Sequence, residues 1–330
     1  MRYPTVHQRR SRREFLAIAG AAGALAAAAC SSKKPAPGAR GSGSVTLRHV
    51  FGETTIPTPP KRVVSAGYTE QDDLLAVGIV PIAVTNWFGD QPFGVWPWAQ
   101  PRLGGAKPVV LNLDNGIQVG QIAGLKPDLI VAIDAGVDAD TYQKLSAIAP
   151  TIAQSDGDAF FEPWKDQASA IGQAVFQAEQ MKSLIDGVDK KFTTAGEKYP
   201  QFSGKKVILL QGRLHQDNVV ATMPGWRTEF LTQMHLVIAD SITTFAVDQQ
   251  RAFIPRDQAK GALDAADVLI WTTDSDDERL ALLANPDVAA LGAHNIFTTK
   301  DQAGAIAFAS PLSYPLVADQ LPPLIAKALG

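Results

Sequence analysis

Apolar residues fall into two alternating patterns along this chain. Short apolar runs bounded by glycine, proline or acidic residues are typical of buried parallel strands, and apolar residues three or four positions apart predict helices. In the first half, these patterns predict strands at 62–66, 81–85, 128–133 and 151–153, and helices at 69–78, 117–125 and 142–147. Strands separated by helices indicate an α/β layout with a parallel sheet covered on both faces.

The second half repeats this order after one long helix. Five apolar residues on one helical face predict a helix over about 177–199, namely Met181, Leu184, Ile185, Val188 and Phe192. Further strands are predicted at 207–211, 219–222, 267–271 and 295–298, before a closing helix at 316–329 that Pro322-Pro323 bends or interrupts. We therefore expect two Rossmann-like lobes with parallel sheets joined by a single long helix. The predicted segments are an N-terminal lobe (45–162), a helical region (163–200) and a C-terminal lobe (201–330).

The N-terminal segment has the features of an export signal. Ser11-Arg12-Arg13-Glu14-Phe15-Leu16-Ala17 places paired arginines before an apolar run that is too short for a membrane span of about 20 residues. Small residues precede Cys30, as in bacterial lipoprotein signals, but Ala27 stands where such signals usually carry leucine, so a plain signal anchor is the alternative. We predict a twin-arginine lipoprotein signal peptide over 1–29, acylation of Cys30, and a flexible tether over 30–44. These place the protein in the cell envelope, at the outer face of the cytoplasmic membrane.

Charge and composition exclude several classes of function. The whole chain of 330 residues has a net charge of −3, and the predicted signal removes five arginines and one glutamate, which leaves −7. An acidic body of this kind argues against a nucleic-acid partner. Cys30 is the only cysteine, so the mature fold has no disulfide and no cysteine-based zinc site. Glycine-rich nucleotide motifs and catalytic motifs are absent, so an exported cofactor-binding enzyme is the weaker alternative.

Three segments carry a family resemblance. They are Pro59-Pro60-Lys61-Arg62-Val63-Val64-Ser65 with the helix that follows, Leu125-Lys126-Pro127-Asp128-Leu129-Ile130, and Ile254-Pro255-Arg256-Asp257 with the strand at 267–270. Together they resemble the class III substrate-binding proteins of ABC importers for iron chelates, haem and cobalamin, and look closest to mycobacterial iron-compound-binding lipoproteins. The resemblance implies a monomeric, lipid-anchored binding protein without an intrinsic cofactor. Its cleft would capture a ferric siderophore or haem and deliver it to permease subunits.

Ligands of α/β proteins bind at the carboxyl ends of the strands. Aromatic rings provide contact area for a bulky chelate there, and arginines bind its acidic oxygens. On this basis we predict a set of ligand-binding residues: Tyr68, Trp87, Trp96, Trp98, Arg213, His215, Trp226, Arg227 and Tyr314. The aromatic loop at 87–98 has a second interpretation, as an apolar plug over the sheet.

Two further predictions concern iron and the permease. If the ligand is haem, its iron could be coordinated by Tyr68, His215 or Tyr314. The resemblance implies one permease-docking acid on each lobe. Asp257 takes that position in the second lobe, whereas Gly120 stands in the first, where Glu70 or Asp114 could compensate. This departure leaves open a scaffold that kept the fold and lost transport.

Overall fold

The first lobe is built on five parallel strands. The computed structural model describes residues 43–156, 160–291 and 294–330, so the predicted signal peptide, Cys30 and most of the predicted tether lie outside the described residues. The strands pair in the order β5-β4-β3-β6-β7, and all four pairings are parallel. Their bounds are β3 Val63–Ser65, β4 Ala83–Thr85, β5 Val109–Leu111, β6 Leu129–Ala132 and β7 Thr151–Ala153.

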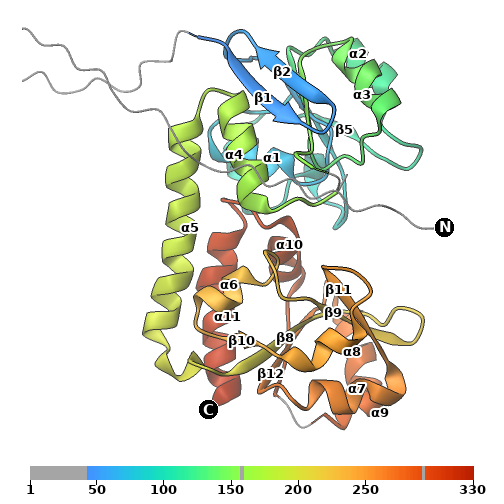
Figure 1. Ribbon diagram of the computed structural model, residues 1–330, viewed down its shortest axis with the longest axis vertical. Coiled ribbons are helices and arrows are strands. Elements are labelled where there is room, and N and C mark those ends of the chain that lie inside the picture. The colour runs from blue at the N-terminus through green and yellow to red at the C-terminus, as the bar shows by residue number, and fades with distance from the viewer. Residues whose placement is uncertain (1–42, 157–159, 292–293) are drawn as a thin grey trace, which may run out of the picture. The chain divides into compact units, whose positions relative to one another are not determined.

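Helices and a separate hairpin surround this sheet (Figure 1). The hairpin pairs β1 (Val45–His49) with β2 (Gly52–Ile56) in antiparallel fashion. The helices are α1 Glu70–Ala76, α2 Val119–Leu125 and α3 Ala139–Ser146, with 3-10 turns η1 Pro92–Gly94 and η2 Gln100–Leu103. The predicted alternation of strands and helices is thus confirmed in this lobe.

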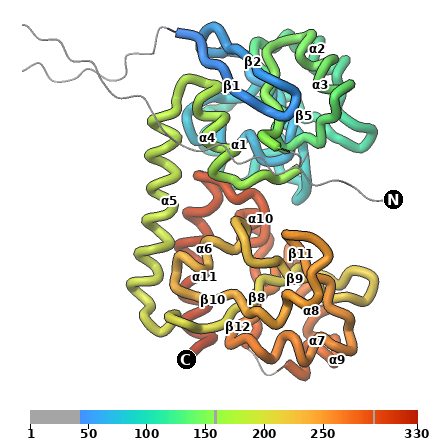
Figure 2. Tube along the Cα trace, in the orientation of Figure 1, coloured from blue at the N-terminus to red at the C-terminus, as the bar shows by residue number. Residues whose placement is uncertain are grey.

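Two helices lead from the first lobe to the second. They are α4 (Trp164–Ala174) and α5 (Ala178–Lys198), the second of which has 21 residues. In Figures 1 and 2, α5 runs alongside both sheets. The long helix predicted from the apolar spacing is present, and Met181, Ile185, Val188 and Phe192 form its buried face.

The second sheet combines parallel and antiparallel pairs. Its order is β11-β9-β8-β12-β13, and β10 also pairs with β8. The bounds are β8 Lys206–Gln211, β9 Asn218–Thr222, β10 Val237–Ile238, β11 Arg251–Pro255, β12 Val268–Thr272 and β13 His294–Phe297. Strand β9 runs antiparallel to both of its neighbours, β8 and β11, which differs from the all-parallel sheet expected. The reason is the short connection at 212–217, because a hairpin reverses the chain where a crossover helix would keep the strands parallel.

The second lobe is completed by helices on both sides of its sheet. They are α6 Glu229–Gln233, α7 Arg256–Leu263, α8 Asp276–Ala284, α9 Pro286–Ala289, α10 Lys300–Phe308 and α11 Tyr314–Leu329, with 3-10 turns η3 Pro200–Phe202 and η4 Asp240–Phe245. Pro322 and Pro323 lie inside α11, which continues through them. None of the helices in the described residues has the length and apolar character of a membrane span.

One apolar core runs through both lobes. A continuous cluster of buried side chains includes Val63 and Leu129 of the first sheet, Phe192 of α5, and Val207 and Ile270 of the second sheet. All described residues belong to one compact unit, residues 41–330. The lobes are therefore joined by shared packing in addition to α5.

Candidate functional site

An open cavity of about 880 Å³ is lined by residues of both lobes. A cavity of this size is in the range that holds a drug-sized ligand. Its lining is aromatic on the side of the first lobe and combines polar, charged and aliphatic side chains on the side of the second. The lining residues are Tyr68, Trp87, Phe160, Phe161, Leu209, Gln211, Thr222, Arg227, Asp248, Gln249, Gln250, Arg251, Thr272, Ala303, Ile306 and Ala307.

The aromatic wall follows the carboxyl ends of three parallel strands. Tyr68 lies beyond β3, Trp87 beyond β4, and Phe160 and Phe161 beyond β7. The Tyr68 ring lies 5.5 Å from Trp87, 5.9 Å from Phe160 and 6.3 Å from Phe161, in stacked orientations. Phe160 is 42% exposed, so this wall presents ring surface to the cavity. Such rings supply apolar contact area and lose little conformational entropy on binding.

Two arginines form the charged side of the cavity. Arg251 is held by Asp248, whose Oδ2 accepts hydrogen bonds from its Nε at 3.1 Å and Nη2 at 2.9 Å. Arg227 donates to Oε1 of the neutral Gln250 at 3.1 Å, and its guanidinium carbon lies 4.2 Å from the Trp226 ring centre and 4.8 Å from that of Phe161. The carboxylate of Asp248 thus offsets Arg251, and Arg227 provides the uncompensated positive charge of the cavity lining.

Four carboxyl groups are buried behind the aromatic wall. Glu70, Asp72 and Asp73 of α1 and Asp134 after β6 are each at most 1% exposed. Glu70 accepts hydrogen bonds from the backbone N–H groups of Gly67 and Asp134, both at 2.9 Å. A Cβ at residue 67 would collide with the Glu70 side chain and the Asp134 backbone, so glycine is required at this close approach. Burial raises the pKa of all four carboxyl groups.

These groups predict the pH dependence of folding. Burial raises the pKa of Asp72 to about 6, and burial together with Glu70 raises that of Asp134 to about 8. The folded protein therefore keeps protons that the unfolded chain releases at about pH 4, so stability is highest in acid and is lost as pH rises through these values. We expect the thermal unfolding midpoint to fall by several degrees between about pH 5 and about pH 9, and Asp134→Asn to flatten the upper part of this fall. A midpoint that rises over this range would contradict the prediction.

Comparison with known proteins agrees with this architecture. Residues 63–303 match the family profile described as "Periplasmic binding protein". The chain belongs to the periplasmic binding protein family. This match confirms the predicted resemblance to substrate-binding proteins. It also confirms the prediction of a binding protein, not an enzyme.

Individual relatives of this periplasmic binding protein include bacterial receptors. It is 31% identical over 190 residues to the protein of Bacillus subtilis named "Probable siderophore-binding lipoprotein YfiY". The matched segment covers 56% of this chain and 55% of the relative. It is 24% identical over 193 residues to the Escherichia coli "Fe(3+) dicitrate-binding periplasmic protein FecB". This match covers 58% of this chain and 62% of the relative. The chain thus spans little more than half the length of the curated relatives that it matches.

A solved structure extends the likeness to nearly the whole chain. A periplasmic solute binding protein from Mycobacterium smegmatis is 66% identical, covers 87% of this chain and 99% of its own, and superposes with a TM-score of 0.83. The class III binding-protein fold expected from the sequence is confirmed.

Two tryptophans predicted in the ligand site of this binding protein do not line the cavity. Trp96 is 1% exposed and stacks on Trp98 at 4.9 Å, and its ring also contacts Phe308 of α10 at 6.0 Å. Trp98 donates from Nε1 to Asp72 Oδ2 at 2.7 Å. This pair of rings therefore joins the first lobe to α10, as the alternative interpretation of an apolar plug expects.

Arg213, His215 and Trp226 also lie away from the cavity lining. Arg213 has a side chain that is 71% exposed and pairs with Glu278 Oε1 at 2.7 Å. His215 is exposed in the hairpin after β8, and its ring contacts Phe253 at 5.5 Å. Both residues lie in the hairpin that reverses the chain, outside the lining of the cavity. Trp226 serves the site indirectly, because its ring supports the guanidinium of Arg227.

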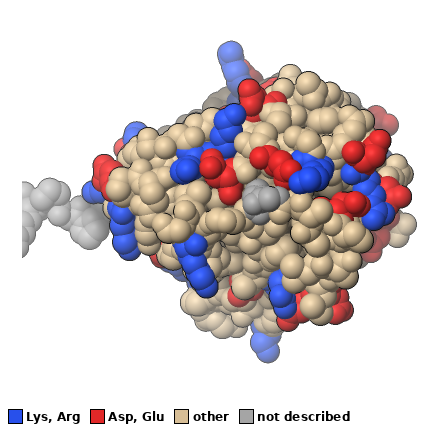
Figure 3. Space-filling model, turned by 90° about the horizontal axis from the view of Figure 1, so that it is seen from below, with Lys and Arg blue, Asp and Glu red and all other residues tan. Residues whose placement is uncertain are grey.

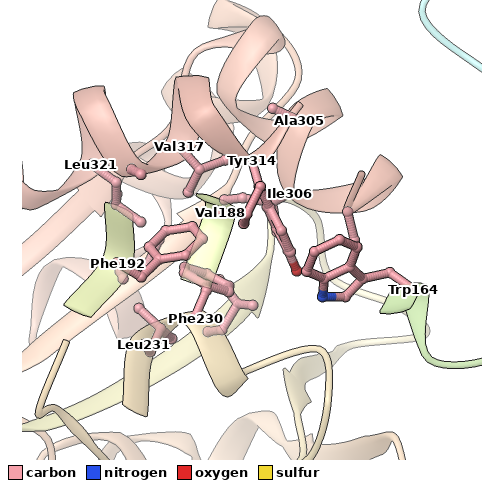
Figure 4. Packing of buried hydrophobic residues seen from close by; sticks show 14 of the residues in the cluster. Trp164, Val188, Phe192, Phe230, Leu231, Ala305, Ile306, Tyr314, Val317 and Leu321 are labelled. Carbon is pink, nitrogen blue, oxygen red and sulfur yellow. The ribbon is translucent and has the colours of Figure 1, made fainter. Parts of the chain in front are cut away.

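Tyr314 is a core residue, which argues against contact with a ligand or iron. It is 2% exposed and lies among Trp164, Phe192 and Phe230, whose ring centres are 5.4 to 5.7 Å away (Figure 4). Burial raises the pKa of its phenol, which opposes formation of a phenolate ligand. Among the described residues, nothing forms a hydrogen bond with its hydroxyl group.

This unpartnered hydroxyl group predicts the effect of a conservative change. Tyr314→Phe removes a buried polar atom and keeps the ring packing, so we expect the free energy of unfolding to stay the same or to rise by about 1 kcal/mol. Urea unfolding measures the change, with Tyr314→Ala as the comparison that empties the ring position. A loss above about 2 kcal/mol in Tyr314→Phe would show that the hydroxyl group has a partner.

The predicted docking acids differ in exposure. Asp257 is exposed in the first turn of α7, and Asp114 is exposed in the loop after β5. Glu70 is fully buried, so the prediction that it docks a permease is wrong. Acids in the first turn of a helix usually face solvent, but α1 is buried along its whole length. Gly120 is exposed on α2 and presents no acid there.

The sequence predictions missed part of the aromatic wall. Phe160 and Phe161 were not among the candidates, although they follow β7 at the carboxyl edge that supplied Tyr68 and Trp87. The aromatic pair before Glu162-Pro163 was the available signal. Among the described residues, no group of three His, Cys, Asp or Glu side chains is placed to hold a metal ion.

Proposed function

We propose that this protein is an extracytoplasmic, lipid-anchored receptor that binds an iron chelate in the cavity between its lobes and delivers it to an ABC importer. The observation that supports this most directly is the cavity of about 880 Å³, with aromatic rings on one side and Arg227 on the other. Two relatives carry names that refer to a siderophore and to ferric dicitrate. A chelate whose own oxygens fill the coordination sphere of iron needs no metal ligand from the protein.

The favoured ligand is an anionic ferric siderophore. Arg227 lies between two aromatic faces with a neutral hydrogen-bond partner, so its charge is available to an acidic oxygen of the ligand. The rings of Tyr68, Trp87 and Phe161 then contact the apolar parts of the chelate. Among the rings of the wall, Trp87 provides a fluorescent reporter of occupancy.

Tryptophan-fluorescence quenching tests the function. A panel of an anionic ferric catecholate, ferrichrome, ferric citrate and haem would be titrated against the purified protein, with the iron-free chelators as controls. We expect micromolar or tighter binding of one ferric class, which corresponds to about −8 kcal/mol. Trp87→Phe should remove part of the quenching and keep the affinity within a few fold. Failure of the whole panel to bind would favour the scaffold alternative.

Haem remains a prediction to be decided by the same panel. Tyr68 is the phenol in the cavity lining, but burial raises its pKa, and Asp134 and Asp114 add to the rise. A neutral phenol is a poor ligand for iron, so we do not assign coordination to Tyr68. If haem binds, its propionates would be expected at Arg227 and its Soret band should be unchanged in Tyr68→Phe.

Delivery to a permease is proposed to depend on Asp257. The residue is exposed at the start of α7, and basic and acidic side chains are interspersed on the described part of the face seen in Figure 3. Asp257→Ala should lower iron-dependent uptake in cells at least severalfold while the affinity for the ligand in solution stays unchanged. Gly120→Asp is the matched gain variant, since it restores an acid to the first lobe. Normal uptake by Asp257→Ala would remove the support for docking at this position.

A further inference from the structure

Asp134 lies directly behind the part of the aromatic wall that faces Arg227. Its side chain is fully buried, and Oδ1 accepts a hydrogen bond from the backbone N–H of Phe161 at 3.1 Å. Oδ2 accepts from Oγ1 of Thr69 at 3.0 Å, next to Tyr68 in the chain. The Asp134 carboxyl group thus contacts two segments that carry cavity rings, through the backbone of Phe161 and the side chain of Thr69.

The backbone of Phe161 has a conformation that the hydrogen bond to Asp134 helps to maintain. Its φ angle is 62°, in the left-handed region that a side chain other than glycine rarely adopts. Such a conformation costs on the order of 1 kcal/mol and persists only where surrounding contacts enforce it. The hydrogen bond to Asp134 is a contact of that kind, and the Phe161 ring lies against the guanidinium of Arg227.

The charges around Asp134 come from both lobes. Glu70 and Asp73 of α1 and the phenol of Tyr68 interact electrostatically with it from the first lobe, and Arg227 does so from the second. Arg227 is the cation whose charge acts on Asp134, and the Phe161 ring lies against its guanidinium. An ionised Asp134 would therefore place a negative charge on the far side of Phe161 from the ligand.

We propose that Asp134 is a positioning residue of the ligand cavity whose proton sets how strongly Arg227 attracts an anionic ferric chelate. The inference rests on the proposed function and adds a regulation to it. With the carboxyl group protonated, the charge of Arg227 is directed at the ligand. After ionisation, Asp134 offsets that charge and affinity falls. By linkage, a bound anion makes Asp134 hold its proton more tightly.

The titration falls in an accessible range. Burial and the neighbouring Glu70 raise the pKa of Asp134 to about 8, whereas the hydrogen bonds from Thr69 and Phe161 and the charge of Arg227 oppose the rise. Glu70 and Asp73 also have raised pKa values because they are buried. Arg227 is the cation among the groups that shift the pKa of Asp134.

Affinity measured against pH tests the coupling. The probes are an anionic ferric tris-catecholate and the neutral hydroxamate complex ferrichrome, titrated by fluorescence quenching from about pH 6 to about pH 9. For the catecholate, we expect affinity to fall on the order of tenfold from about pH 7 to about pH 9, as one linked proton requires. Ferrichrome affinity should stay constant over this range.

Two variants identify the group responsible. Asp134→Asn keeps an oxygen that accepts from Phe161 and should abolish the fall for the catecholate. Asp72→Asn changes a different buried acid, which lies on α1 and accepts hydrogen bonds from Trp98 and Ser310. In this variant, the affinity for the catecholate should fall with pH as it does in the unchanged protein. A fall that persists in Asp134→Asn belongs to the probe or to another group and overturns the proposal.

A measurement without ligand separates this inference from the proposed function. The infrared band of the protonated Asp134 carboxyl group can be titrated as the difference between the protein and Asp134→Asn. Arg227→Gln should move this titration to higher pH by at least half a unit, because a neighbouring cation is lost. If no ferric probe binds, the proposed function fails, but this titration still tests the coupling between Asp134 and Arg227. A titration that Arg227→Gln does not move overturns the inference.

Discussion

Replacing Arg227 with glutamine should lower the affinity for an anionic ferric chelate on the order of 100-fold. The guanidinium is held by Gln250 and stacks on Trp226 and Phe161, so it is already oriented before the ligand arrives. A charge-assisted hydrogen bond in such a setting contributes about 1.5 to 3 kcal/mol, which is the free energy that a loss of this size represents. Quenching titrations with a ferric tris-catecholate at neutral pH measure it.

Arg213→Gln is the matched control for this change. Arg213 is exposed, pairs with Glu278 and lies outside the cavity lining, so its removal should leave affinity unchanged. An effect of less than threefold in Arg227→Gln, or an equal effect in both variants, would show that Arg227 does not contact the ligand.

Replacing Trp96 with alanine should cost about 4 kcal/mol in the free energy of unfolding. The ring is 1% exposed and packs between Trp98, Phe88 and Phe308. Gly304 of α10 lies so close that a Cβ there would come within 2.7 Å of three Trp96 ring atoms. Truncation therefore leaves a large cavity at the contact between the first lobe and α10.

Urea unfolding would measure this loss, with Trp226→Ala as the control. Trp226 is also a tryptophan but only half-buried, so its truncation should cost clearly less. If Trp96→Ala lost under about 1 kcal/mol, the surroundings would have to collapse around the missing ring, and the contact would not be the tight one described.

Much of the fold could be predicted from the sequence because its signals are local. Buried strands such as 128–133 and the apolar face of α5 have periodicities that identify them without tertiary information. The direction of β9 could not be predicted in this way. It depends on whether 212–217 forms a hairpin or a crossover, and the pattern of strands is the same in both cases.

The lining of the site could be predicted only for residues whose place at the end of a strand puts them in the cavity. The rule that ligands bind at carboxyl ends identified Tyr68 and Trp87 as lining residues. It failed for Trp96 and Tyr314, since an aromatic residue near a strand end can equally complete the core. The burial of the acids of α1 could not be predicted either, because three acids in the first turn of a seven-residue helix normally face water.

The shared core has a consequence for transport. Because buried side chains run without a break from the first sheet through α5 to the second, swinging the lobes far apart would expose apolar surface at about 25 cal/mol per Å². Empty and occupied receptors should therefore present nearly the same outline to the membrane. An importer would therefore have to recognise the occupied state by direct contact with the cargo at the opening of the cavity. That contact would limit transport cycles that carry no cargo.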